Sequence, residues 1–397
     1  MLEGLKVVEF ATYIAAPGAA GILAEWGAEV IKVERPEGDP MRDFLAHTKT
    51  EMGANPTFDL DNRGKRAIVL DISKPSARDA LAKLASEADV FLTNVRPGAL
   101  KRNGLDYETL KAANPGLIYA IVTGYGLEGP EAHRPGFDVA AFWARAGVAR
   151  LTIPKDMEPF GLRTGTGDHV TALSTVSAIL AAVVERGRTG KGRLVETSLL
   201  RSGVYAIGSD LAIQLRFGRV ASTKRRSGPT DPIGNFFKSR DERWFVVLPR
   251  QQHRDWPAIV GVAGRPELLE DPRFTTGRLR REHTEALVAE LDKGFTSMDF
   301  AEIARRMDEA DLVWSPAQTA ADVADDPQAI ASGCFVEIEG EDGQRFRSPA
   351  TPARFPEEPE RVFHPAPALG AHTREVLGEL GYAADAIDAM YAEGAAA

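Results

Sequence analysis

The first 125 residues alternate short runs of apolar and β-branched residues with segments in which apolar residues recur at helical spacing. Such a regular exchange is typical of a parallel sheet whose strands are joined by crossover helices. The sequence therefore predicts an α/β fold, and sheets of this kind bind ligands outside the carboxyl ends of their strands. Ser73 is expected to cap the helix that begins at Pro75. The predicted strands are 6–10, 29–34, 66–71, 89–95 and 116–123.

Two further apolar helices are predicted over 168–186 and 199–217, with a strand at 193–198 between them. The segment 220–232 is polar, basic and rich in turn-forming residues, as linkers between domains usually are. The chain is therefore expected to contain more than one domain. Beyond the linker we expect a hairpin over 235–249, charged helices to about residue 321, a second hairpin over 335–346 that turns at 341–343, and two short helices.

The composition excludes several classes of partner. The 48 basic and 57 acidic residues give a net charge of −9, which argues against a surface for nucleic acid or for an anionic membrane but allows a local basic pocket. Cys334 is the only cysteine and cannot form an internal disulfide, which fits a reducing cytoplasm. The N-terminus is too acidic for a signal peptide, and the apolar stretch 170–184 is too short to span a membrane. We therefore expect a cytoplasmic protein in which this stretch is a buried helix.

The stretch 124–129 fits the G-x-G-x-x-G pattern of dinucleotide-binding loops. Such a loop must open a helix whose N-terminus faces the pyrophosphate, whereas here Pro130 and then 134–137 continue as loop. A nicotinamide or flavin site is therefore not expected. The seven histidines are scattered without ligand spacing, so no metal site is expected.

Asp138 stands at the end of the loop-rich segment that follows the fifth predicted strand, directly before a helix predicted from Val139. Because open α/β sheets bind ligands at the carboxyl ends of their strands, this carboxylate is a candidate catalytic group. An aspartate directly before a helix is equally suited to be its N-cap. Spacing alone favours the N-cap.

Several separated blocks of sequence occur in a characteristic order: 4–42, 94–104, 124–126, 134–138, 189–192 and 367–381. Together they resemble the family III, or CaiB/BaiF-type, CoA-transferases, and the resemblance runs essentially from end to end. Three shorter stretches, 55–58, 167–169 and 309–312, are most similar to the branch that acts on 2-hydroxy and aromatic acids such as hydroxyisocaproate, phenyllactate or cinnamate.

The resemblance implies that an aspartate attacks an acyl-CoA thioester to form a mixed anhydride. The CoA thiolate leaves and returns to give an enzyme-bound CoA thioester, from which an incoming acid collects CoA through a second anhydride. Asp138 matches the nucleophile. The implied substrates are an acyl-CoA and a small carboxylic acid, with no tightly bound cofactor, because the anhydride keeps the acyl group activated. Backbone N–H groups around Gly124, Gly126 and 165–167 either bind the oxyanions or belong to plain turns.

The resemblance also implies contacts to CoA. Arginine pairs well with phosphate oxygens, which suits a local cationic pocket on an acidic protein. The matched positions are Ile14 and Ala15 at the pantetheine and thiol end, Arg35 and Arg102 at the nucleotide phosphates, Leu70 and Asn94 beside the adenosine, and Tyr125 on the approach to Asp138.

Two alternative functions remain open. The similar α-methylacyl-CoA racemases carry a histidine directly before the aspartate, because moving an α-proton needs a base and an acid. Here Phe137 occupies that position, although His133 and His169 are nearby in sequence. The second alternative is a non-catalytic CoA-binding homologue. Asp168 is either the cap of the long helix, which we favour, or a second carboxylate of the site.

The fold that the resemblance implies is a Rossmann-like large domain over 1–215, completed by 326–397, with a linker and a smaller α+β domain over 216–325. It further implies an interlocked, ring-like homodimer.

Overall fold

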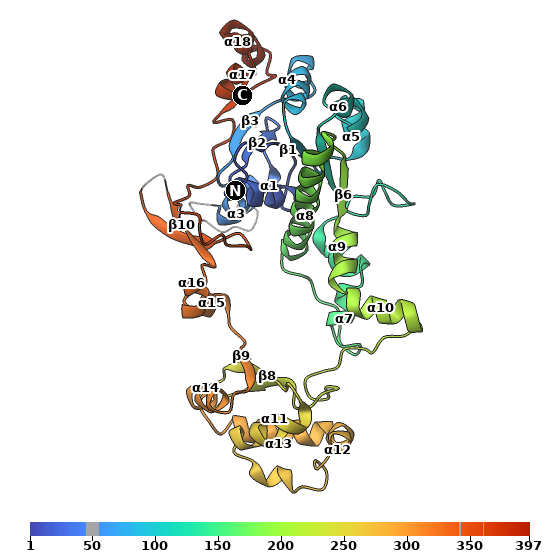
Figure 1. Cartoon of the computed structure of the whole chain (residues 1–397), viewed down its shortest axis with the longest axis vertical. Coiled ribbons are helices and arrows are strands. Elements are labelled where there is room, and N and C mark those ends of the chain that lie inside the picture. The colour runs from blue at the N-terminus through green and yellow to red at the C-terminus, as the bar shows by residue number, and fades with distance from the viewer. Residues whose placement is uncertain (45–54, 341–342, 360) are drawn as a thin grey trace. The chain divides into compact units, whose positions relative to one another are not determined.

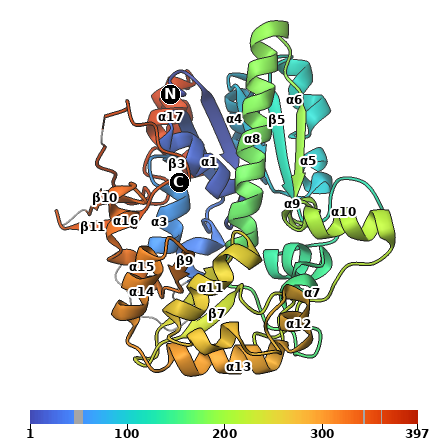
Figure 2. The ribbon, with the colours of Figure 1, turned by 60° about the horizontal axis from the view of Figure 1, so that its bottom comes forward.

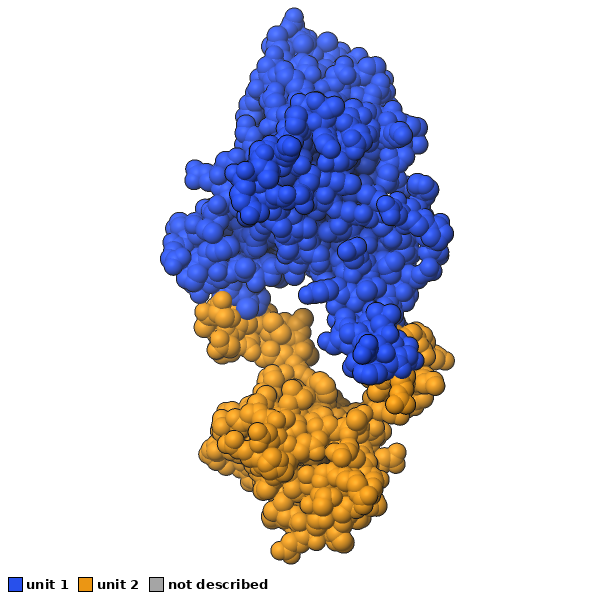
Figure 3. All heavy atoms as spheres, turned by 45° about the vertical axis from the view of Figure 1, so that its right-hand side comes forward, with its two compact units in different colours: residues 1–149, 160–218, 333–397 blue, residues 150–159, 219–332 orange. Residues whose placement is uncertain are grey.

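The computed structural model describes residues 1–44, 55–340, 343–359 and 361–397. The chain forms two compact units, coloured blue and orange in Figure 3. Residues 1–149, 160–218 and 333–397 make up the first, which we call the large unit; residues 150–159 and 219–332 make up the second, the small unit. Two of the three residues of the predicted turn at 341–343 lie outside the described residues.

The large unit is built on a six-stranded sheet with the strand order β3-β2-β1-β4-β5-β6 (Figure 1). Every neighbouring pair is parallel, which confirms the predicted α/β fold with a parallel sheet. This is the order of Rossmann folds, in which the chain reverses its direction of winding between β1 and β4. The strands are β1 (Lys6–Phe10), β2 (Glu29–Glu34), β3 (Arg66–Val69), β4 (Val90–Thr93), β5 (Ile118–Thr123) and β6 (Leu194–Ser198).

Helices cover both faces of this sheet because successive strand residues point to opposite sides. Val8 and Phe10 of β1 share a buried cluster with one set of helices, whereas Glu9 between them lies on the other face, against which α1 packs. Figure 2 shows α1 and α8 side by side. The helices on this face are α1 (Ala15–Glu25) and α8 (Thr166–Thr189); those of the other cluster are α4 (Pro75–Ser86), α5 (Pro97–Arg102), α6 (Tyr107–Ala113), α17 (Thr373–Glu379) and α18 (Ala384–Ala392).

α8 is the one helix in the described part of the chain that is long and apolar enough to cross a membrane. It packs along α1 and against β5 and β6, as the core helix of a sheet does. Its N-cap is Gly165, with φ +86°, so the expectation that Asp168 caps this helix is wrong. A glycine can adopt this left-handed conformation without strain, which lets the helix start before Asp168.

Two other local predictions need correction. Lys74, and not Ser73, is the N-cap of α4, since Ser73 N donates to Asp71 Oδ1 (2.9 Å) in the preceding turn. The helix predicted over 199–217 is interrupted at Ile207, next to a glycine that weakens helix continuity. The resulting helices are α9 (Leu199–Ala206) and α10 (Gly208–Phe217). The helix predicted from Val139 is confirmed, and it is the π-helix η2 (Val139–Arg145).

The remaining elements of the large unit surround the sheet. They are η1 (Pro40–Asp43), α3 (Pro56–Asn62), α7 (Val148–Thr152), which is shared with the small unit, and the hairpin of β10 (Phe335–Glu339) and β11 (Arg345–Pro349).

The small unit has a core of its own, in which Phe237, Phe245 and Phe295 pack ring against ring. The predicted hairpin is confirmed as β7 (Asn235–Lys238) and β8 (Trp244–Leu248). The strand β9 (Val313–Pro316), which pairs with β8, was not predicted because its four residues end in a proline. The helices are α11 (Gln252–Val262), η3 (Pro266–Leu269), α12 (Gly277–Glu282), α13 (Thr284–Phe295), α14 (Phe300–Glu309), α15 (Ala320–Ala324) and α16 (Pro327–Ala331).

Candidate active site

The predicted CoA contacts follow the carboxyl ends of neighbouring strands. Arg35, Leu70 and Asn94 come directly after β2, β3 and β4. Ile14 and Ala15 stand at the start of α1, after β1, and Tyr125 comes two residues after β5. The carboxyl ends of parallel strands share one edge of the sheet, so the topology brings these positions to one rim.

Asn94 joins the two loops at the point where the winding of the sheet reverses. Its Nδ2 donates to Thr12 O (2.6 Å), and Thr12 N donates to its Oδ1 (3.0 Å). The loop after β1 is also held by Asp39, whose Oδ1 accepts a hydrogen bond from Tyr13 N (3.1 Å). Tyr13 has φ +68°. α1 then begins without a side-chain cap, which leaves first-turn N–H groups available to an anion.

The side chains of these positions differ in how far they reach solvent. Arg35 and Arg102 are exposed, and neither forms an ion pair within the described part of the chain. Leu70 lies in the core, 1% exposed, and pairs with Ala396, so its side chain faces away from the rim. Tyr125 is half-buried, with the Arg134 guanidinium 5.6 Å from its ring centroid.

Asp138 is the N-cap of η2 and is only 4% exposed. Its Oδ1 accepts from Val139 N (2.7 Å), and its Oδ2 accepts from Gly165 N (3.1 Å). The capping role that spacing favours is therefore present. The second bond also ties the carboxylate to the start of α8, so that both of its oxygens accept a backbone N–H.

Asp168 lies in the first turn of α8, half-buried. Burial, followed by the negative charge of Asp138, raises the pKa of the Asp168 carboxyl to about 7. Within the described residues this carboxyl has no hydrogen-bond partner. A group with such a shifted pKa, next to a second carboxylate, is a marker of functional sites.

His169 follows on the same helix, and its Nε2 lies 3.1 Å from Asp61 Oδ1. This hydrogen bond, together with the negative charges of Asp61, Asp168 and Asp138, raises the pKa of His169 above its ordinary value. Asp61 belongs to α3 and is buried. The site therefore contains an imidazole among three carboxyl groups.

Gly165 packs these groups together. A Cβ atom on Gly165 would lie 3.4 Å from both His169 Cε1 and Ile14 Cδ1, and its amide already donates to Asp138. The structure thus brings Ile14, Asp138 and His169 around one glycine. Of the other glycines considered as oxyanion donors, Gly126 donates its N–H to Thr123 Oγ1 (2.9 Å).

Asp61 could not be singled out from the sequence. It lies near the end of the short helix α3, two residues after Asp59, and only the folded chain places it against α8.

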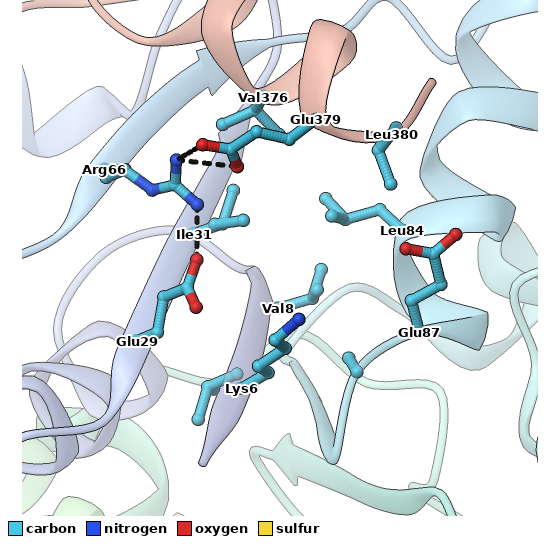
Figure 4. Close-up of a pocket in the computed structure, with 12 residues that line it drawn as sticks. Lys6, Val8, Glu29, Ile31, Arg66, Leu84, Glu87, Val376, Glu379 and Leu380 are labelled. Atoms are coloured by element: carbon cyan, nitrogen blue, oxygen red, sulfur yellow. Dashed lines mark hydrogen bonds and ion pairs between the residues drawn. The ribbon is translucent and has the colours of Figure 1, made fainter. Parts of the chain in front are cut away.

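A small hollow of about 90 Å³ lies at the amino-terminal edge of the sheet, opposite the edge that holds the predicted CoA contacts (Figure 4). Its Arg66 guanidinium points toward the carboxylates of Glu29 and Glu379, with which it forms ion pairs. Because this cation is already neutralised and the parallel strands begin here, the carboxyl edge is the better candidate for an active site.

The chain is similar to known proteins over nearly its whole length. Residues 2–373 match the model of CoA-transferase family III. The chain is 35% identical over 384 residues to (R)-2-hydroxy-4-methylpentanoate CoA-transferase from Clostridioides difficile, covering 96% of each chain. It is 32% identical to cinnamoyl-CoA:phenyllactate CoA-transferase from Clostridium sporogenes, covering 98% of this chain and 96% of that one.

A solved structure is also similar: a CAIB/BAIF family protein from Brucella suis superposes with a TM-score of 0.85 at 31% identity, over 96% of this chain and 99% of that one. The match to the family model spans nearly the whole chain. The alignments with the two named CoA-transferases cover at least 96% of each protein. The chain is therefore an enzyme that belongs to CoA-transferase family III.

Proposed function

We propose that this enzyme moves CoA from an acyl-CoA to a 2-hydroxy or aromatic carboxylic acid through an aspartyl anhydride. The observation that carries the proposal is the pair of aspartates, Asp138 and Asp168, at the start of α8 beside the carboxyl edge of a Rossmann-type sheet. The relatives named for 2-hydroxy-4-methylpentanoate and for phenyllactate support the choice of acid.

One carboxylate of the pair must attack the thioester carbon. Asp138 is the candidate that the family resemblance implies. Two observations support Asp168 instead: its carboxyl is less buried than that of Asp138 and has no hydrogen-bond partner in the described part of the chain, whereas both oxygens of Asp138 accept backbone N–H groups. A raised pKa also makes the ionised carboxylate of Asp168 more nucleophilic. In this version Asp138 is a positioning residue that fixes the start of α8.

The reaction then proceeds in balanced steps. An aspartate oxygen bonds to the acyl carbon as the C–S bond breaks, which gives an anhydride and CoA thiolate. The thiolate attacks the aspartyl carbonyl carbon and releases the donor acid, leaving a thioester between CoA and the enzyme. The acceptor carboxylate repeats both steps in reverse, so no proton is consumed overall and no tightly bound cofactor is required.

For CoA we propose that Arg35 and Arg102 bind the phosphates, with Ile14, Ala15, Asn94 and Tyr125 along its length, and Leu70 through its backbone because its side chain lies in the core. The two arginines are exposed cations on a chain of net charge −9, and neither is neutralised by an ion pair within the described residues. We assign this binding to the large domain, 1–215 with 326–397, and not to the linker and small domain, 216–325.

We further propose a cytoplasmic homodimer. Among the residues that the structure describes, none of those in α10 is buried, and Leu215 and Phe217 are 84% and 70% exposed. A helix that exposes such side chains needs a partner surface, and a second copy of this chain is the one that the family resemblance implies. With a single cysteine the chain cannot form an internal disulfide, which supports a cytoplasmic location.

Trapping the anhydride tests the function. Incubation with an acyl-CoA and hydroxylamine should convert the nucleophilic aspartate to a hydroxamate, which peptide mass spectrometry locates. An adduct on Asp168, lost in Asp168→Asn, supports the assignment from the structure; an adduct on Asp138 supports the assignment from the sequence. CoA binding with neither adduct nor turnover would point to a non-catalytic homologue.

Racemase activity is the alternative that Phe137 argues against, because its side chain has no proton to exchange. A 2-methylacyl-CoA incubated with the enzyme in D2O should take up no deuterium at its α-carbon when no acceptor acid is present. Rapid uptake would favour the racemase.

A further inference from the structure

We propose that the Asp61–His169 pair binds the carboxylate of the free acid substrate. This inference rests on the proposed function and deepens it, since it assigns the acid to a binding group of this chain. It concerns a pair of side chains outside the predicted CoA contacts.

The pair is held in one orientation by three elements. Asp61 on α3 accepts from His169 Nε2 on α8, with an N–O separation of 3.1 Å. Gly18 on α1 leaves the space for this bond, because a Cβ atom there would lie 3.0 Å from Asp61 Oδ1 and 3.6 Å from His169 Cδ2. A carboxylate can only accept, so Nε2 carries a proton and its orientation is fixed.

The opposite side of the ring lies beside Gly165, whose amide binds Asp138. A Cβ atom on Gly165 would lie 3.7 Å from His169 Nδ1, and the amide of the same glycine donates to Asp138 Oδ2. The His169 side chain is 45% exposed, and Nδ1 has no partner in the described part of the chain. An incoming group can therefore reach Nδ1 beside Asp138 and Asp168.

Charge decides what that group is. Asp61, Asp138 and Asp168 are the charged groups that act on His169, and they come from α3, the loop before η2 and α8. A fourth carboxylate brought among these three acids is repelled unless a cation accompanies it. The same acids raise the pKa of His169, which favours its protonated form, and that form supplies the cation with an Nδ1–H donor.

Binding of the free acid tests this without turnover. We would measure phenyllactate and CoA binding by calorimetry for the wild type, His169→Gln, Asp61→Asn and the control His253→Gln, an exposed histidine of the small unit. His169→Gln should weaken phenyllactate binding about tenfold or more, the scale of a charge-assisted hydrogen bond, and leave CoA binding unchanged. Asp61→Asn keeps an acceptor for Nε2 but lowers the pKa of the ring, so its loss should appear only as pH rises.

The pH dependence separates charge from shape. Since the pKa of His169 lies above its ordinary value, wild-type affinity for phenyllactate should hold below that pKa and fall as pH rises through it. Asp168, with a pKa of about 7, also gains its charge as pH rises, so His169→Gln should show a smaller fall that comes from Asp168 alone. Equal phenyllactate affinity in the wild type and His169→Gln, or an equal loss for phenyllactate and CoA, overturns the inference. Absence of hydroxamate in the wild type, with these affinities as expected, counts against the proposed function alone.

Discussion

Asp168 carries a charge that its surroundings disfavour. Its folded pKa of about 7 lies above the ordinary value of 3.8, so folding favours the protonated form. The corresponding stability is fully present below pH 3.8 and is lost as pH rises through 7. We therefore expect Asp168→Asn to abolish transfer and yet to melt ~4 °C higher than the wild type at pH 8.

The difference in melting temperature should shrink as pH falls toward 4, because both side chains are then neutral. Calorimetric melting over pH 4–8 measures it, with Asp79→Asn, an exposed aspartate of α4, as the control for losing one negative charge. An Asp168→Asn variant that is less stable than the wild type at pH 8 would contradict the strained carboxylate.

Arg35 and Arg102 give a second expectation at this scale. Each Ala variant should raise KM for every acyl-CoA by a similar factor, about tenfold, because a phosphate contact is common to all of them. Lys101→Ala, which removes an exposed cation next to Arg102, is the control. Unchanged binding of CoA and of dephospho-CoA in both arginine variants would refute the phosphate assignment.

Some residues of the candidate site could be predicted from the sequence alone and others could not. Asp138 was recognisable because it closes a glycine-rich loop after a strand, a local pattern. Asp61 was not, because its role depends on contact with His169, 108 residues away along the chain. The raised pKa of Asp168 is likewise a property of burial, which no spacing reveals.

At the scale of elements, α8 contains two glycines with opposite requirements. A Cβ atom on Gly167 would lie 2.7 Å from Phe142 Cγ, so this glycine lets η2 approach the helix. A Cβ atom on Gly187 would meet nothing within 4 Å. Gly167→Ala should destabilise the enzyme by about 1–3 kcal/mol, and Gly187→Ala should stabilise it by about 0.5 kcal/mol.

Denaturant unfolding of the two variants measures this difference. The pair is matched, since both changes add the same methyl group to the same helix. Gly167→Ala should also reduce transfer, because it displaces η2 and with it Asp138. Equal stability of the two variants would mean that η2 tolerates the added methyl.

Elements were predictable where one rule governs them. The five strands predicted in the first 125 residues are all present. They were predictable because a short, nearly continuous apolar run is typical of a parallel strand that is buried on both faces. The π-helical form of η2 and the break between α9 and α10 were not predicted. Both depend on packing or on a single glycine within an apolar pattern that fits one continuous helix.

For the whole molecule, the exposed side chains of α10 lead to an expectation about assembly. Sedimentation equilibrium should find a dimer down to nanomolar concentration, because an interlocked ring leaves no stable free protomer. Changing both Leu215 and Phe217 to Asp should give a poorly folded or inactive chain. Val323→Asp, an exposed apolar residue of the small unit, should change neither assembly nor activity. A folded, active monomer of the wild type would rule out interlocking.

The large unit is closed by its most distant sequence. Val69 N donates to Thr373 Oγ1, 304 residues later, and Leu377, Met390 and Ala396 complete the apolar core beside β3. A ribosome makes these residues after the core of the small unit, 233–312, so during synthesis the part of the sheet beside β3 stays uncovered while that core is already complete. We therefore expect the nascent large unit to need chaperones for longer than the small unit does.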